Sequence, residues 1–515
     1  MLMSGLKKQE SLLVIVAVTT YLMLVIYGAS EGVRGSDQYW YLADIKALIS
    51  GAGIVSNNVY PVSIFNGADL PRPFIHNVLY VYLSAVPGYL VGPYAGAIVI
   101  NLLSGLITAF FIYLLVCRLT THRLIALIVS IVFLLSPLTY WLSINVLSEA
   151  AMAPLVMASV FTFVTAGDSW QKWLIGTILM GLLFLSRGSF LLLFILIPFF
   201  YLIQNLPLSP RKIVFSSLLF VGIVSFWWVS NSIIEHNASC SFVGLLNMAI
   251  PGVSSNMDCF FNIKEQEINL SLWWDKALYG LKKQFLSFDI SGILFYWPVN
   301  LMSAIAFYFV YKKYSNEVVI LSLYAIAILA LHLITIVLVQ NQFRYLMVVA
   351  PISFTLLGVF LGLKFGYFEP RKWIVAVTVL VFAFMTVNIT FARIVREQAH
   401  TDAIAINQLL NLFNQYIRKE ESILVDMELS KLREAIILGY CLDPRITLFV
   451  TNEYSDDEYR RMLRRINAKW LITKEHSPIT EKIHNVGLTK IRDLPAPYQD
   501  MSLYLMTGHL EEDAN

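Results

Sequence analysis

The sequence predicts an α-helical protein that crosses a membrane many times and carries a small α/β domain at its carboxyl end. Of its 515 residues, 57% are hydrophobic and only 14% are charged, whereas soluble domains carry roughly 25% charged residues. A chain this apolar cannot bury its surface in water, so the bilayer must be its solvent. The net charge of +3 and the lack of a basic stripe give no reason to expect nucleic acid as a partner.

Apolar runs long enough to cross a bilayer define the first part of the chain, residues 1–395. The stretch 77–92 is short and interrupted by Pro87-Gly88 and Gly92-Pro93, so we predict a re-entrant segment or one arm of a bent pair there. The prediction is about eleven transmembrane helices, within a range of roughly 11 to 13. They lie near 11–30, 94–117, 124–141, 147–166, 172–187, 189–206, 213–234, 289–311, 318–339, 346–363 and 373–392.

The distribution of Lys and Arg predicts the orientation of these crossings. If all the short basic segments are cytoplasmic, the N-terminus lies inside, while the long loops 31–76 and 235–288 and the tail lie outside. Chemistry is expected on this outer face, because loops on a rigid scaffold carry most functional residues. The basic segments are residues 7–8, 118–123, 211–212, 312–313 and 364–372.

The tail, residues 396–515, has a different pattern from the membrane part. Short apolar strands alternate with helical segments, which predicts a small α/β domain outside the membrane. It has no glycine-rich phosphate loop, so we expect it to have a structural support role or a recognition role, with structural support favoured. The expected strands are 422–426, 446–450 and 470–473, and the expected helices are 429–438 and 456–466.

Two of the four cysteines, Cys240 and Cys259, share the loop 235–288. They can form a disulfide if that loop faces an oxidising compartment, or remain free thiols, and the sequence does not choose between these states. No Cys/His spacing indicates a metal site.

Ionisable residues at the predicted outer ends of the crossings are the candidate site residues, because charge at membrane depth is costly and usually functional. Asp37 follows the first crossing and begins a helix whose apolar face includes Tyr41. It can cap that helix or act as a general base, and the pattern alone favours the cap. The other candidates are Asp69, Arg72, His76, Glu149, Arg187, Arg344 and Tyr345.

The arginines among these candidates suit an anionic ligand. Arg187 and Arg344 lie at the same predicted outer level, and Arg binds phosphate through bidentate hydrogen bonds. Either can instead be an anchor that reaches the membrane surface. Arg72 lies between Pro71 and Pro73, and His76 follows three residues after Pro73. This stretch can be a rigid entry to the next helix, or Arg72 or His76 can contact an anionic headgroup.

These short motifs together resemble the GT-C superfamily of membrane glycosyltransferases. Asp37 is similar to the acidic motif of the first outer loop, and Pro71-Arg72-Pro73-Phe74 resembles a Pro-Pro motif that leads into the second membrane segment. Ser148-Glu149, Arg187-Gly188 and Arg344-Tyr345 resemble landmarks of the branch that contains protein O-mannosyltransferases and the lipid A aminoarabinose transferase. The resemblance spans roughly residues 10–395 and rests on the order and sidedness of the motifs.

The resemblance implies an inverting enzyme in a bacterial inner membrane. It would move a sugar from a polyprenyl-phosphate donor to a glycan, lipid or protein acceptor on the extracytoplasmic face. Gln38 follows Asp37 where the family has a second acid, which leaves the use of a divalent metal open. The implied roles are Asp37 as general base, Arg187, Arg344, Tyr345 and Arg72 at the donor phosphate, and Glu149, His76, Tyr41 and Asp69 in support of the acceptor.

A transporter or flippase of lipid-linked sugars is the alternative class of function. It is less favoured because the two halves show no internal repeat and the outer loops are long. If Asp37 is only a helix cap, the base role passes to Glu149, Asp44 or Asp69.

Overall fold

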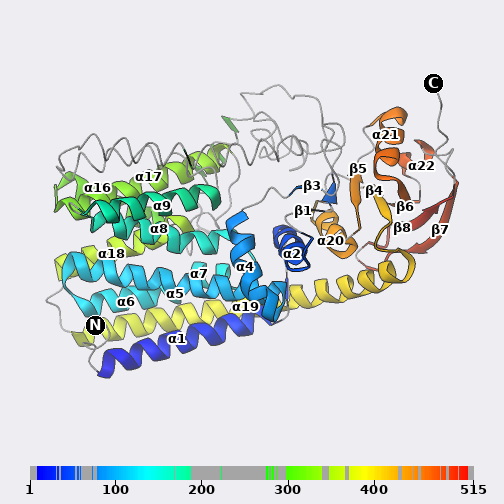
Figure 1. The fold of residues 1–515 in the computed structure, drawn as a ribbon. Helices are drawn as coiled ribbons and strands as arrows, with labels where there is room; N and C mark the ends of the chain where they lie inside the picture. The colour runs from blue at the N-terminus through cyan, green and yellow to red at the C-terminus, as the bar shows by residue number, and fades with distance from the viewer. Residues whose placement is uncertain are drawn as a thin grey trace.

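The computed structural model consists of a bundle of helices and a mixed β-sheet, connected by the long helix α19, Pro370–Tyr416 (Figure 1). The structure confirms a mostly helical chain with a small sheet at its carboxyl end. Apart from isolated positions, the structure describes residues 8–30, 36–52, 78–166, 169–186, 297–338, 347–365, 370–426, 432–450, 454–482 and 487–507, with short strands at 55–59 and 72–73.

Most of the predicted apolar runs form helices of the bundle. The run 124–141 is bent by 52° between α6 and α7, where Pro137 begins a new helix as proline commonly does. The predicted runs 189–206 and 213–234 lie outside the described residues, apart from Gly222. The helices are α1 (Lys8–Ala29), α5 (Pro93–Thr120), α6 (Arg123–Leu134), α7 (Pro137–Ser143), α8 (Ser148–Val164), α9 (Trp170–Ser186), α16 (Trp297–Tyr311), α17 (Asn316–Leu338) and α18 (Ala350–Phe365).

Three helices among the described residues are long and apolar enough to cross a membrane alone, and the bent pair α6 and α7 makes a fourth candidate. Shorter apolar helices such as α8 and α18 accompany them. The number of about eleven crossings stays a prediction. The three long segments are Glu10–Ala29, Pro93–Thr120 and Thr378–Tyr416.

The interrupted stretch 77–92 forms one helix, α4 (Val78–Val91), that continues through Pro87. The break expected at Pro87 is therefore wrong. Gly92, with φ of 92°, joins α4 to α5, and Gly96 of α5 lies directly against Gly88 of α4. The 14 residues of α4 reach about 21 Å, which is less than the roughly 30 Å of the hydrocarbon core. A short helix packed tightly on α5 agrees with the expected bent pair.

Several basic residues of the described part of the chain lie at the end of the bundle far from the sheet. Arg118 at the end of α5 pairs with Glu317 at the start of α17, with 3.1 Å between Nη2 and Oε1. Lys364 near the end of α18 lies 6.0 Å from the ring centroid of Tyr308 in α16. The amino end of α1 lies at this same end (Figure 1). Arg118, Lys364 and the amino end of α1 therefore lie at one end of the bundle, and the orientation of that end stays a prediction.

The sheet has the strand order β2-β5-β4-β6-β8-β7. Its centre is parallel and its β8-β7 edge is antiparallel. The three predicted strands and the helix 456–466 are confirmed, whereas the predicted helix 429–438 begins at Leu432, and β7 and β8 were not predicted. The elements are β4 (Ser422–Asp426), α20 (Leu432–Leu442), β5 (Thr447–Val450), α21 (Asp456–Ile466), β6 (Ala468–Thr473), α22 (Pro478–Lys482), β7 (Leu488–Asp493) and β8 (Ser502–Met506).

The first outer loop also contributes to this sheet. Its strand β2 (Asn58–Val59) pairs in parallel with β5, and its strands β1 (Val55–Ser56) and β3 (Arg72–Pro73) pair with each other. The domain boundary expected at residue 396 stays a prediction. Helix α19 runs without a break across that position, so the bundle and the sheet are joined by regular helix.

Candidate functional site

Helix α2, Ser36–Ile49, carries Asp37 and lies between the bundle and the sheet (Figure 1). Leu42 and Ile45 are buried in the core of the bundle. Tyr39, from the same helix, is buried in the core formed by the sheet and α19. Because α2 packs on both parts of the molecule, its amino end is held from two sides.

Asp37 lies in the first turn of α2, and the next residue, Gln38, fixes this turn. The Gln38 side-chain amide donates to Oδ1 of Asn145 at 2.7 Å. The backbone N–H of Val146 donates to Oε1 of Gln38 at 2.9 Å. Gln38 is only 5% exposed, and buried polar groups that are fully hydrogen-bonded define a single arrangement. Gln38 therefore positions the start of α2 against the segment that leads into α8.

Asn101 holds the other side of that segment. Its side-chain amide, buried within α5, donates to the backbone oxygens of Asn145 at 2.5 Å and Leu142 at 3.4 Å. The Asn145 side chain in turn donates to the backbone oxygen of Trp141. The link between α7 and α8 is thereby tied to both α2 and α5. Three buried amides thus fix the backbone around the candidate site.

Two of the predicted site residues, Tyr41 and Glu149, lie beside this network. The Tyr41 hydroxyl is 3.1 Å from Oγ of Ser148, and its ring packs edge-on against Tyr80 of α4 with 5.3 Å between centroids. Glu149 is 2% exposed in the first turn of α8, where the helix dipole favours a carboxylate. The Tyr80 hydroxyl lies within electrostatic range of both Glu149 and Tyr41. The starts of α2, α4 and α8 therefore meet in one polar cluster.

Of the remaining predicted residues, the structure describes Asp44 and Arg72. Asp44 is buried on α2, two helical turns after Asp37 and on the same face of the helix. Arg72 lies in β3, opposite Ser56 of β1. The predicted residues outside the described part of the chain are Asp69, His76, Arg187, Cys240, Cys259, Arg344 and Tyr345.

Sequence reasoning missed the buried amides that organise the cluster. Asn101 lies inside the apolar run 94–117, and a polar side chain at such a position was the signal that could have identified it. Gln38 and Asn145 lie in short polar segments and are 107 residues apart, so no local pattern connects them. Among the described residues, no group of three or more His, Cys, Asp or Glu side chains is arranged to hold a metal ion.

Comparison with known proteins identifies the fold. No family model matches the chain, and no curated protein matches it. The chain is similar to the crystal structure of ArnT from Cupriavidus metallidurans in the apo state, with a TM-score of 0.62 and 13% identity over 96% of this chain and 98% of that chain. It is also similar to the same protein bound to undecaprenyl phosphate, with a TM-score of 0.57 and 12% identity over the same shares.

This likeness extends over nearly the whole of both chains. It agrees, at the level of the fold, with the resemblance inferred from the motifs. At 12–13% identity the likeness establishes an ArnT-like fold and leaves the activity to be argued from the site.

Proposed function

We propose that the chain is an integral-membrane glycosyltransferase that moves a sugar from a polyprenyl-phosphate donor to a glycan, lipid or protein acceptor. The observation that carries the proposal is the buried amide network of Gln38, Asn145 and Val146. It fixes the turn that contains Asp37 beside Glu149, in a fold shared with a protein that binds undecaprenyl phosphate. A carboxylate that acts as a general base must be held at a defined position, and Asp37 lies in the turn that Gln38 fixes.

In the proposed reaction, an acceptor hydroxyl oxygen attacks the anomeric carbon on the side opposite the phosphate. The bond from that carbon to the phosphate oxygen breaks, and the configuration inverts. Asp37 accepts the hydroxyl proton during the attack. Arg187 and Arg344, with Tyr345 and Arg72, stabilise the charge that grows on the leaving phosphate.

Glu149 and Tyr41 form the supporting part of the proposed site. The hydrogen bond between the Tyr41 hydroxyl and Ser148 joins α2 to the first turn of α8. Glu149 is assigned to orient the acceptor or to pair with a phosphate-binding arginine. His76 and Asp69, on the first outer loop, are assigned to the acceptor side.

The central experiment compares wild-type protein with Asp37→Asn in proteoliposomes supplied with a panel of undecaprenyl-phosphate sugars. Asn keeps the volume of the side chain and still caps a helix. We expect transfer to fall by roughly 10²–10⁴-fold, while binding of undecaprenyl phosphate is retained. The control is Asp443→Asn, which removes a carboxylate that contacts Lys46 near the other end of α2.

Two outcomes would contradict this assignment. Equal transfer by Asp37→Asn would move the base role to Glu149, Asp44 or Asp69. Movement of the lipid-linked sugar across the bilayer by the wild type, without covalent transfer from any donor, would identify a flippase.

The phosphate assignment is tested separately with Arg187→Ala and Arg344→Ala. Loss of a charge-assisted hydrogen bond costs about 1.5–3 kcal/mol, so each variant should use the donor about ten- to a hundredfold less well. Arg118→Ala, at the opposite end of the bundle, is the control. Wild-type donor use by both variants would remove the arginines from the site.

We further propose that the basic end of the bundle faces the cytoplasm of a bacterium and that the sheet lies outside. The positive-inside rule supports this orientation. In a background without native cysteines, a membrane-impermeant maleimide added to cells should label Lys469→Cys and spare Lys313→Cys. The Lys469 side chain is 56% exposed, so it can be reached, and the reverse labelling pattern would invert the topology.

A further inference from the structure

A pocket of about 300 Å³ lies where α19 passes the end of α1. Its lining comes from the last turns of α1 and from the middle of α19, and includes no residue of the polar cluster around α2. The five lining residues include two arginines and a histidine, and they are Tyr27, Arg393, Arg396, Glu397 and His400.

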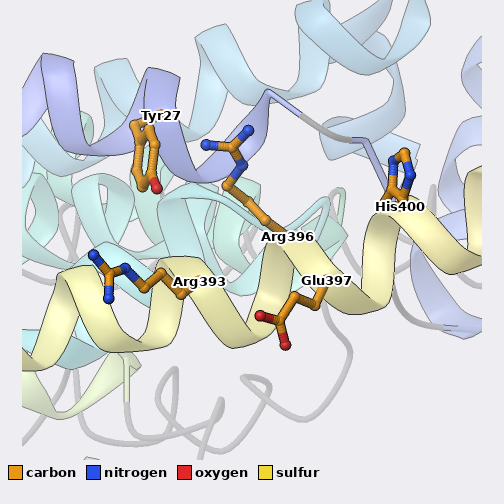
Figure 2. Close-up of a pocket in the computed structure, with 5 residues that line it drawn as sticks. All are labelled: Tyr27, Arg393, Arg396, Glu397 and His400. Carbon is orange, nitrogen blue, oxygen red and sulfur yellow. The ribbon is translucent and has the colours of Figure 1, made fainter.

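The cations of this pocket are arranged along one side of α19. Arg393, Arg396 and His400 follow each other at spacings of three and four residues, which places them on one helical face. The Arg396 guanidinium lies over the Tyr27 ring, with Cζ 4.5 Å from the centroid. Figure 2 shows these two groups side by side and the Glu397 carboxylate directed away from both. The contact with Tyr27 therefore orients the Arg396 fork.

The charge of the lining suits a ligand with one negative charge. Two arginines and one glutamate give a net charge of +1 when His400 is neutral. A phosphodiester carries one negative charge and two free oxygens, which match the bidentate fork of arginine. A phosphomonoester such as a polyprenyl phosphate carries up to two charges and is less well balanced.

The surrounding surface indicates that the ligand is a lipid. On the bundle side of the pocket, Met23 of α1 and Phe382 of α19 are 67% and 71% exposed. Large apolar side chains exposed on helices of this length face acyl chains. From residue 397 onward α19 becomes polar in sequence, so the pocket lies at the level of the lipid headgroups, where Tyr and Arg are favoured.

We infer that this pocket binds the phosphodiester headgroup of an anionic membrane phospholipid, with the acyl chains lying along α1 and α19. The bound lipid joins α1 to the helix that leads to the sheet, and thereby steadies the sheet against the membrane. The inference is independent of the transfer reaction proposed for Asp37, because the two sites share no residue.

The test uses the full chain in nanodiscs and native mass spectrometry after release. Wild-type protein should retain phosphatidylglycerol in preference to phosphatidylcholine with the same acyl chains. The double variant Arg393→Gln and Arg396→Gln should lose that preference by about tenfold or more, since charge-assisted bonds to phosphate are removed. The matched control is Arg464→Gln with Arg465→Gln, two exposed residues of α21 that carry the same charge.

Arg396→Lys keeps the charge but loses the fork, so its preference should fall between those of the wild type and the double variant. If the double variant folds poorly, the lipid preference of Arg396→Lys still tests the inference. Unchanged preference in the double variant would overturn the inference. So would displacement of the lipid by inorganic phosphate at the same concentration, which would indicate a site for soluble phosphate. If the double variant instead retains phosphatidylglycerol but loses undecaprenyl phosphate, the pocket binds the carrier lipid and the inference is wrong.

Discussion

Replacing Gln38 by Leu tests whether buried hydrogen bonds hold the start of α2 in place. Leu has a similar volume but cannot hydrogen-bond. The substitution leaves the Val146 N–H and the Asn145 Oδ1 without the bonds that they make to Gln38. Each buried group left unsatisfied costs about 1–3 kcal/mol, so the expected loss is about 2–6 kcal/mol. This is a large part of the 5–15 kcal/mol that typically separates folded from unfolded proteins.

The loss is measured by unfolding purified protein with SDS and following tryptophan fluorescence. Transfer should fall more than the binding of undecaprenyl phosphate, because the turn that contains Asp37 is displaced while the arginines are not. The matched control is Gln171→Leu at the exposed start of α9, where the Gln side chain accepts a hydrogen bond from Ser169 and the cost should stay within about 0.5 kcal/mol. If the Gln38 and Gln171 variants unfold at the same SDS fraction, the buried network does not fix α2.

Two further substitutions test packing elsewhere in the molecule. A methyl group at Gly105 would overlap the Tyr21 hydroxyl. Gly105→Ala should therefore lower the free energy of unfolding in SDS by about 1–3 kcal/mol. An unchanged free energy would show that α1 and α5 can move apart enough to accept the methyl group. Arg445, 2% exposed, donates to the backbone oxygen of Ile417 at 2.7 Å and satisfies the end of α19, so Arg445→Met should speed hydrogen exchange in the last turn of α19. Unchanged exchange there would show that water replaces the guanidinium.

The helices of the bundle could be predicted because each is specified by a local apolar run. The same holds for β4 and β5, whose short apolar segments are bounded by polar residues. The pairing of β2 with β5 could not be predicted, because two residues of a polar loop carry no periodic signal. Long-range pairing of this kind depends on the position of the whole first loop.

The same distinction separates the parts of the candidate site. Asp37 and Glu149 could be singled out, because a charged residue at the end of an apolar run is conspicuous. Their arrangement depends on Gln38 and Asn145, which join elements distant in the sequence. At the sequence level Gln38 was only a departure from an acidic motif, and in the structure it is the hydrogen-bonded link between α2 and the start of α8.

The docking of the sheet on α2 leads to a last prediction, centred on Tyr39. The Tyr39 side chain is 2% exposed within the core of the sheet, although it belongs to the helix that carries Asp37. Its ring lies 5.2 Å from that of Tyr440 in α20, and Lys46 pairs with Asp443 at 3.1 Å. The partly exposed ion pair contributes only about 0–1 kcal/mol, so we expect the buried aromatic ring to contribute more than the ion pair does.

Tyr39→Ala should therefore cost about 3–5 kcal/mol, as deletion of a large buried aromatic side chain does. We expect faster hydrogen exchange in α20 and a fall in transfer, because the sheet no longer restrains α2 next to Asp37. Tyr39→Phe keeps the ring and loses the bond from its hydroxyl to the Val33 oxygen, so its cost should be about 0.5–1.5 kcal/mol. Tyr82→Ala, at a position 44% exposed on α4, controls for loss of an aromatic ring from the surface. If Tyr39→Ala transfers sugar at the wild-type rate while α20 exchanges faster, the sheet is attached to α2 without helping to hold the catalytic turn.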